Sequence, residues 1–176
     1  METLPRDVDE KIAREITSFI YREAELLEDR RYIEWLDLLA HDVEYIVHVR
    51  ITRSKSELPR LSEISDKRYF MYENKYSLEM RVKRLYTEYA WAEDPPSRVR
   101  YHINRIVVES SEKPDEVRAR YNVFLVRSIA DEPDYEFISY TRIDTFRRVN
   151  GSWKLCKRIV IPDSSVMTLR YISIFL

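Results

Sequence analysis

Residues 134–162 read DYEFISYTRIDTFRRVNGSWKLCKRIVIP, and this stretch decides the fold. Asn150-Gly151 lies between two runs that are rich in β-branched and aromatic residues. Both central positions of a tight primed turn favour positive φ angles, which Asn and Gly tolerate best. The stretch therefore predicts a β-hairpin with strands over residues 134–149 and 152–162.

The segments before this hairpin have the same strand-like character. Residues 98–110 and 116–129 are rich in Val, Tyr and Phe, and polar turns follow them at 111–115 and 131–134. Four strands in succession, joined by short turns, are typical of an antiparallel meander.

The N-terminal part of the chain reads as helix. A stripe of apolar residues at helical spacing predicts a long helix from about Asp7 to Asp29. Its members are Ile12, Ile16, Phe19, Ile20, Ala24 and Leu27. A second, short helix is indicated by Tyr32, Trp35, Leu38 and Leu39.

A strand and a third helix are expected next. Residues 42–51, DVEYIVHVRI, alternate as a strand does, whereas residues 52–73 are polar and irregular and are expected to form a long excursion. Asn74 can cap a third helix, which Pro95-Pro96 would end because proline lacks the backbone donor. The apolar side of the strand would be Val43, Tyr45, Val47 and Val49. The buried face of the helix would be Leu78, Val82, Leu85 and Tyr89.

Helices followed by a long antiparallel meander define an α+β fold. The natural packing is a cone-shaped curved antiparallel sheet wrapped around the N-terminal helices. The chain, residues 1–176, is expected to be a single domain, because it has no repeat, low-complexity stretch or linker. The open end of such a cone is a natural place for a pocket.

The composition excludes several classes of function. Thirty basic and 31 acidic residues leave a net charge of -1, which gives no general attraction to nucleic acid or to an acidic membrane. The one glycine, Gly151, rules out the Gly-rich phosphate loops. No apolar run is long enough to span a bilayer, and the first residues lack the apolar core of a signal peptide. With Cys156 as the one cysteine, a cytoplasmic location is expected.

Four residues are candidates for acid–base chemistry inside the cone: Asp42, Tyr45, His48 and His102. A buried carboxylate beside a histidine would suit a dehydratase or an isomerase. The alternative is that Asp42 closes the turn into its strand and that the histidines lie at interfaces. The sequence favours this alternative, because nothing in it shows the four residues converging. A metal site built from His41, His48 and Asp42 is disfavoured for the same reason.

Two segments indicate contacts with a partner. Residues 87–101, TEYAWAEDPPSRVRY, combine Tyr, Trp and Arg, which are the typical anchors of interfaces. The sequence ends YISIFL, and an apolar end either docks on its own core or is buried against a partner. Trp91 is expected to anchor against the sheet, while the charged residues form ion pairs within the corner or with a neighbour. The residues expected to serve structure or an interface are Trp91, Glu93, Asp94, Pro95, Pro96, Arg98, Arg100, Phe175 and Leu176.

The same corner carries a family resemblance. Residues 90–98, AWAEDPPSR, preceded by RVKRL at 81–85, resemble the signature of the small (beta) subunits of Rieske-type aromatic-ring-hydroxylating dioxygenases, the biphenyl, naphthalene and benzene dioxygenase type. The resemblance runs through the chain in order and departs from the family at His48 and Arg50, where apolar or proline residues are usual. Supporting stretches are YIEWLDLL at 32–39, DVEY at 42–45, Arg147-Arg148, Gly151, WKL at 153–155, Arg158 and SIFL at 173–176.

The resemblance implies a fold and an assembly. The fold would be the cystatin-like cone shared with scytalone dehydratase and nuclear transport factor two. The chain would form a trimer within a heterohexamer of three alpha and three beta chains. The partner alpha subunit would carry the Rieske [2Fe-2S] cluster and the mononuclear Fe(II). This chain would hold no cofactor and no metal, since it lacks the Cys and His residues that a Rieske cluster needs.

The resemblance also implies a division of labour. The beta subunit would be non-catalytic, although in some members of the family it modulates substrate preference. The holoenzyme would convert an aromatic hydrocarbon to a cis-dihydrodiol with electrons from NADH, delivered through a reductase and a ferredoxin. The residues by themselves leave open a free-standing dehydratase or isomerase, and a pure interaction module.

Overall fold

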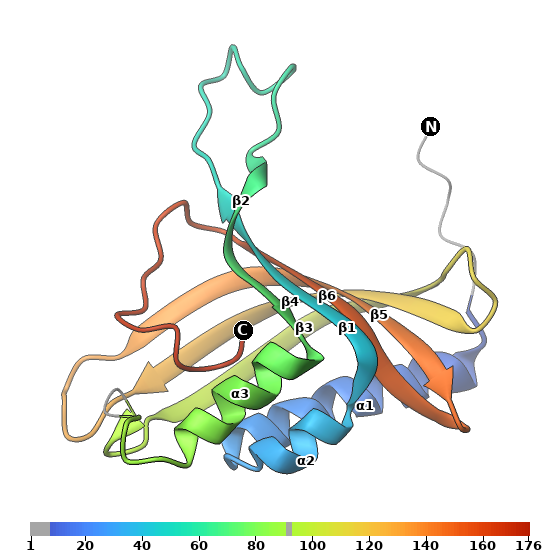
Figure 1. Cartoon of the computed structure of the whole chain (residues 1–176). Helices are drawn as coiled ribbons and strands as arrows, with labels where there is room; N and C mark the ends of the chain where they lie inside the picture. Colours follow the sequence, from blue (N-terminus) through green and yellow to red (C-terminus); the bar gives the residue numbers. More distant parts are fainter. Residues whose placement is uncertain (1–7, 91–92) are drawn as a thin grey trace.

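The computed structural model describes residues 8–90 and 93–176, which form three helices and six strands (Figure 1). The helices all lie on one side of a curved sheet (Figure 1). In chain order the elements are α1 (Glu10–Glu28), α2 (Tyr32–Asp37), β1 (Leu39–Arg50), β2 (Ile64–Asn74), α3 (Lys75–Leu85), β3 (Arg98–Ser110), β4 (Glu116–Ser128), β5 (Glu136–Val149) and β6 (Ser152–Pro162).

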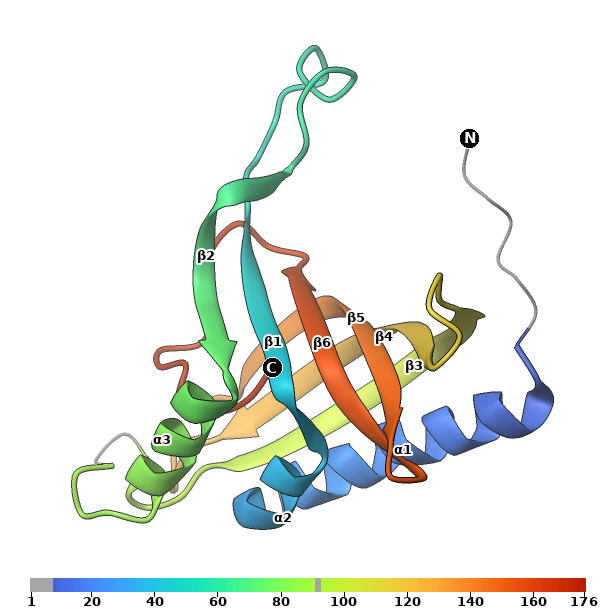
Figure 2. The same cartoon turned by 45° about the vertical axis from the view of Figure 1, so that its right-hand side comes forward.

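The sheet has the strand order β2-β1-β6-β5-β4-β3. The meander β3 to β6 pairs antiparallel throughout, as the sequence predicts, with Asn150-Gly151 at positive φ in the last turn. The predicted antiparallel sheet has one exception, because β1 and β6 run parallel. Parallel neighbours need a crossover, and here everything from β2 to β5 lies between the two strands in sequence. Figure 2 shows the strands fanning over α1.

The prediction of an irregular excursion over residues 52–73 was wrong in its second half. Residues 64–74 form β2, which pairs antiparallel with β1. This edge strand buries little beyond Ser65 and Met71, so its sequence lacks the alternation that identifies a half-buried strand. The rest of the excursion, residues 52–63, projects beyond the body of the protein (Figures 1 and 2).

The third helix is shorter than predicted. Asn74 caps α3 through a reciprocal pair of hydrogen bonds with Ser77, but the helix ends at Leu85, ten residues before the prolines. Tyr89 is 76% exposed and does not belong to a buried face. Residues 86–90 and 93–97 form turns, bends and irregular structure instead, and Pro95 follows a cis peptide bond. The prolines therefore shape the entry to β3 rather than the end of α3.

The core lies between α1 and the concave face of the sheet. Ile16, Ile20 and Leu27 of α1 are at most 1% exposed, and the ring of Phe19 packs edge-on against Phe146 of β5 at 5.0 Å. Asp9 caps α1, while the part of the predicted helix before residue 8 lies outside the described residues. Along the described part of the chain, no helix combines the length and the apolarity needed to cross a membrane.

Candidate functional site: the charged interior of the cone

Four charged side chains meet in the centre of the protein, where a hydrophobic core is expected. Glu23 comes from α1, Arg142 and Asp144 from β5, and Arg158 from β6, and none of them is exposed. Each charge lies in phase with buried apolar residues of its own element. The two positive and two negative charges cancel, which makes their joint burial tolerable.

Arg158 holds this cluster together. Its guanidinium donates to both oxygens of Glu23, at 2.8 and 2.6 Å, and to both oxygens of Asp144, at 2.9 and 2.6 Å. Trp35 adds an indole N–H to Glu23 at 2.9 Å, and Tyr121 donates its hydroxyl to Asp144 at 2.6 Å. Because these charge-assisted bonds have fixed geometry, they position α1 against β5 and β6.

Arg142 is bound mainly by aromatic rings. Its guanidinium carbon lies 5.5 to 5.9 Å from the ring centres of Tyr101, Tyr121 and Tyr140. One nitrogen donates to Glu23 at 3.3 Å. Arg142 is thus a cation held in an aromatic cage, a contact that is favourable when the cation is desolvated.

The electrostatics of this interior do not suit proton transfer near neutral pH. Burial would raise the pKa of Glu23, but the guanidinium groups of Arg158 and Arg142 outweigh it and hold that pKa below its usual range. Burial raises the pKa of Tyr121 well above its usual value. Both groups therefore keep a fixed charge state across the physiological range, whereas a general acid or base needs a pKa near the working pH.

The four acid–base candidates do not converge. Asp42 is exposed and accepts two hydrogen bonds from Arg147 at 2.8 and 3.1 Å, which lower its pKa. Tyr45 lies in the interior and donates to the carbonyl of the last residue, Leu176. His48 belongs to β1, and its Nδ1 lies 3.0 Å from the carbonyl oxygen of Ser65 in β2.

His102 lies apart from the other three candidates. It is exposed on β3, with its ring centre 6.4 Å from that of Phe124 on the outer face of the sheet. The structure therefore does not bring Asp42, Tyr45, His48 and His102 together in one acid–base site, because their side chains have separate surroundings.

The 87–101 corner contributes a buried ion pair rather than a surface network. Glu93 accepts from Arg127 of β4 at 2.5 Å, and Arg127 is fully buried and also donates to the Tyr171 carbonyl at 3.1 Å. Ser97 donates its hydroxyl to the same carboxylate at 2.6 Å. Glu93 and Arg127 thereby fasten the corner to the C-terminal segment.

The remaining corner residues do not form ion pairs with one another, which was one of the two alternatives expected from the sequence. Arg100 pairs with Glu28 of α1, and Arg98 donates to the Ala130 carbonyl at 3.3 Å. Asp94 is exposed and makes no ion pair with any residue that the structure describes. Trp91, the expected anchor, lies outside the described residues.

The apolar C-terminal segment docks on its own core, which is one of the two alternatives left open by the sequence. Phe175 is 1% exposed and lies between the rings of Trp35 at 4.3 Å and Tyr32 at 5.8 Å. Tyr101 donates to the Phe175 carbonyl at 2.5 Å. Phe175 and Leu176 therefore close the open end of the cone from inside, where an open pocket is expected from sequence.

Cys156 is buried. Its thiol donates to the Thr145 carbonyl at 3.2 Å, and burial raises its pKa to about 11. Within residues 8–90 and 93–176, no three His, Cys, Asp or Glu side chains are grouped so that they could hold a metal ion.

Comparison with known proteins assigns the family. The model of the family described as "Ring hydroxylating beta subunit" matches residues 22–169 of the sequence. The chain belongs to the ring-hydroxylating beta subunit family. This family includes the beta subunits of aromatic-ring-hydroxylating dioxygenases, and the resemblance noted in the sequence is confirmed.

Two relatives of this beta subunit are similar over nearly their whole length. The 3-phenylpropionate/cinnamic acid dioxygenase subunit beta of Photorhabdus laumondii is 34% identical over 169 residues, which cover 95% of this chain and 93% of that one. The biphenyl 2,3-dioxygenase subunit beta of Rhodococcus jostii is 33% identical over 177 residues, covering 98% and 93%.

Solved structures confirm the predicted fold. A chain of naphthalene 1,2-dioxygenase with indole bound in the active site superposes with a TM-score of 0.85 at 24% identity, covering 97% of this beta subunit and 89% of that chain. A putative scytalone dehydratase from Novosphingobium aromaticivorans has a TM-score of 0.61 at 15% identity, with coverages of 92% and 88%. At these identities the likeness concerns the fold.

The interior charges of this beta subunit were missed from the sequence, although a signal for them exists. Arg142 and Asp144 alternate in phase with Tyr140 and Phe146, so the strand period alone directs both charges inward. The helical period likewise places Glu23 on the buried apolar face of α1. A charged residue on a face that is otherwise apolar indicates a buried partner on the facing element.

Proposed function

We propose that this chain is the structural subunit of a terminal oxygenase, and that the oxidation of the aromatic ring takes place in a partner alpha subunit. Family membership over residues 22–169 carries the proposal. Two relatives that match nearly all of the chain are named subunits beta of dioxygenases.

The chemistry of the interior supports a structural role. The carboxylates of Glu23 and Asp144 are bound by Arg158, and the open end of the cone is filled by Phe175 and Leu176. A substrate would have to displace a buried Phe ring to reach these groups. We therefore infer that this chain carries no catalytic residue and that its interior charges hold the helices to the sheet.

The cofactors are assigned to the partner on the basis of ligand chemistry. A Rieske cluster needs two cysteines and two histidines, and this chain has one cysteine, which is buried. The residues of this chain thus do not fit the cluster. We infer that the [2Fe-2S] cluster and the mononuclear iron belong to the alpha subunit, which receives its electrons from NADH through separate carriers.

The proposed assembly is a hexamer of three alpha and three beta chains in the cytoplasm. Exposed aromatic residues support contacts with other chains, since large apolar side chains on a surface are typical of interfaces. Tyr76, Tyr89 and Tyr135 are 70%, 76% and 66% exposed, and Phe137 is 54% exposed.

Native mass spectrometry tests the proposal directly. The chain is expressed alone and then together with a Rieske-type alpha subunit, and iron is measured in each species. We expect an iron-free trimer in the first case and an iron-containing hexamer in the second. A stable species of this chain that does not bind the alpha subunit would contradict the proposal.

A further inference from the structure

The outer face of the sheet, which no described helix covers, contains a hollow of about 420 Å³. It lies beside the β-bulge of β3, where Arg105 has a φ of 55°, and beside the exposed ring of Phe124. Bulges of this kind redirect side chains and are common next to binding sites. The hollow is lined by Asn104, Arg105, Arg120, Asn122, Ser139, Thr141 and Asp163, among others.

Among the described residues, three arginines at this hollow lack the ionic partners that most of the arginines have. Arg105 and Arg120 line the hollow. Arg118 lies two residues before Arg120 on β4 and therefore on the same face of the sheet. All three side chains are exposed. In the described part of the chain none of them forms an ion pair. Two carboxylates lie close by: Asp163 accepts from the Ser139 hydroxyl, and Glu109 lies opposite Arg118 in the β3–β4 register. The hollow keeps an excess of positive charge.

A negatively charged surface lies at one end of the same sheet. The β4–β5 turn carries Asp131 and Asp134, both exposed and without an ion pair to any described residue, followed by Tyr135, which is 66% exposed. The 86–97 segment adds exposed Glu88 and Asp94 at the same end, where the Arg98 guanidinium binds the Ala130 carbonyl. We call residues 131–135 the acidic turn.

We propose that the acidic turn of one copy of this chain docks in the arginine hollow of a second copy. Free carboxylates and an exposed tyrosine on one surface complement free arginines and Phe124 on the other, and Arg and Tyr are the residues that anchor interfaces. The proposal rests on the proposed self-association of the chain, for which it supplies the two contact surfaces.

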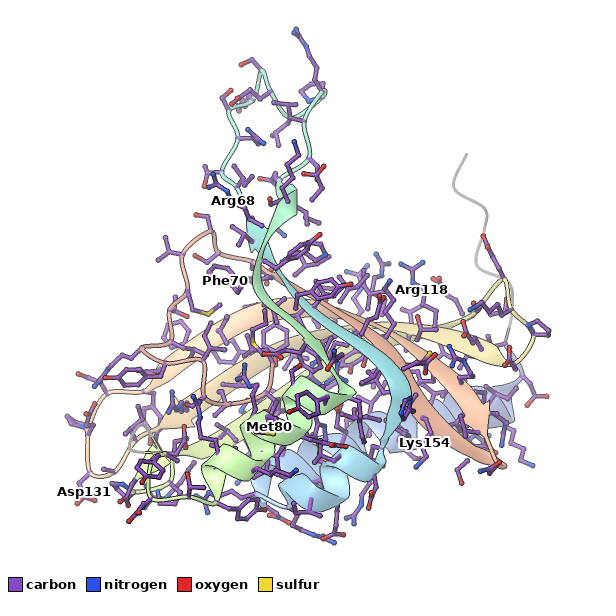
Figure 3. All side chains as sticks on the ribbon, viewed as in Figure 1. Arg68, Phe70, Met80, Arg118, Asp131 and Lys154 are labelled. Carbon is purple, nitrogen blue, oxygen red and sulfur yellow. The ribbon has the colours of Figure 1, made fainter. Side chains whose placement is uncertain are left out.

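The acidic turn and the arginine hollow of one molecule are too far apart to contact each other. Arg120 and Ser128 lie eight residue steps apart along β4, which separates the two surfaces by about 26 Å. Figure 3 shows Asp131 at one end of the molecule and Arg118 toward the other. A contact between two different surfaces is head-to-tail, and such contacts generate a ring when the rotation closes. A trimeric ring uses each surface once per copy and leaves neither exposed.

Charge reversal tests this pairing. One variant carries Asp131→Arg with Asp134→Arg, a second carries Arg105→Glu with Arg120→Glu, and a third combines all four changes in one chain. Glu112→Arg, in the exposed β3–β4 turn, is the matched control. Native mass spectrometry and sedimentation velocity give the oligomeric state of each chain, both alone and with a Rieske-type alpha subunit, and circular dichroism confirms folding.

We expect the first two variants to lose the trimer and the combined variant to regain it, while Glu112→Arg keeps it. Trimers that survive both separate reversals, a combined variant that stays monomeric although folded, or a wild-type chain that never self-associates would each overturn the pairing. A trimer that responds as expected but never binds the alpha subunit would contradict the proposed function and leave the pairing intact.

Discussion

Glu23 shows how much one residue can decide in this protein. It is buried at the meeting point of α1, β5 and β6, and its two oxygens accept hydrogen bonds from Arg158, Arg142 and Trp35. Isolated, any of these charges would destabilise the interior, whereas together they neutralise one another. The chain tolerates buried charges in its core only because each positive group has a negative partner.

Replacing Glu23 by Gln should therefore be costly. The change keeps the shape of the side chain and leaves two buried arginines facing Asp144 alone. We expect the free energy of unfolding to fall by about 3–5 kcal/mol, the usual effect of breaking a buried ion pair. Urea denaturation followed by tryptophan fluorescence measures it.

The matched control is Glu10→Gln, which removes a carboxylate paired with Arg14 on the exposed face of α1. Its effect on unfolding should be close to zero, since exposed pairs contribute little. Equal effects for the two substitutions would show that the interior cluster does not act as the structure implies.

Cys156 should be chemically silent in the folded chain. With a pKa of about 11, only about one thiol in a thousand is ionised at pH 8, and the thiolate is the reactive form. The thiol is also buried. We expect labelling by a thiol reagent at pH 8 to follow the rate of global unfolding and to accelerate with urea. Rapid labelling of the native protein would contradict this burial.

Individual side chains were also the hardest part to predict from sequence. The phase of Arg142 and Asp144 along their strand fixes that they point inward, but not which residue of α1 faces them. Asp42 and His48 have the right chemistry for acid–base work, yet their surroundings are set by partners distant in sequence, Arg147 and Ser65. The sequence shows which side chains could transfer protons, but only tertiary packing determines whether they lie together in a site.

Among the elements, the C-terminal segment after β6 has the largest effect for its size. It forms no helix or strand, yet its last residues are buried against α2 and the strands. Phe175 contacts the Trp35 and Tyr32 rings and lies under the Arg81 guanidinium at 5.5 Å. The segment serves as part of the core although it has no regular structure.

Phe175→Ala should destabilise the chain by about 3–5 kcal/mol, the typical cost of removing a buried Phe ring. The cavity it leaves adjoins Trp35, so the fluorescence of the native state should also change. Val166→Ala is the control, because Val166 belongs to the same segment and is 70% exposed. Thermal denaturation of both variants separates the two cases, and a stable Phe175→Ala protein would refute the docked segment.

Elements with a clear period were predicted well, and those without one were not. The four strands of the meander appear within two residues of their predicted bounds, because alternation and turn residues agree. The edge strand β2 was missed because it pairs by its backbone and buries almost no side chain. The predicted third helix is too long because the sequence signals its end at Pro95-Pro96, whereas residues 86–90 already form turns.

At the scale of the whole molecule, buried ionisable groups make stability depend on pH at both ends of the range. The folded pKa of Glu23 is lowered, so its contribution is present above the unfolded pKa of about 4.3 and is lost as pH falls through the folded value. The folded pKa of Cys156 is raised to about 11, so its contribution is present below the unfolded pKa of about 8.5 and is lost as pH rises toward 11.

We therefore expect a plateau of stability between about pH 5 and pH 8, with losses on both sides. Urea denaturation at a series of pH values measures it. Cys156→Ser is not a suitable probe, because it changes packing as well, but Cys156→Ala should flatten the alkaline side only. An alkaline slope that is the same in Cys156→Ala would show that other groups cause it.

The parallel pairing of β1 with β6 has a consequence for the way the protein is made. Val47 finds its neighbour Val160 more than 100 residues later in the chain. A ribosome adds about 5–20 residues per second, so β6 is synthesised roughly 5–20 s after β1. During that time the backbone edge of β1 that later pairs with β6 is unpaired on the nascent chain. We expect folding to occur after synthesis, and chaperones that shield unpaired strands to raise the yield of this subunit.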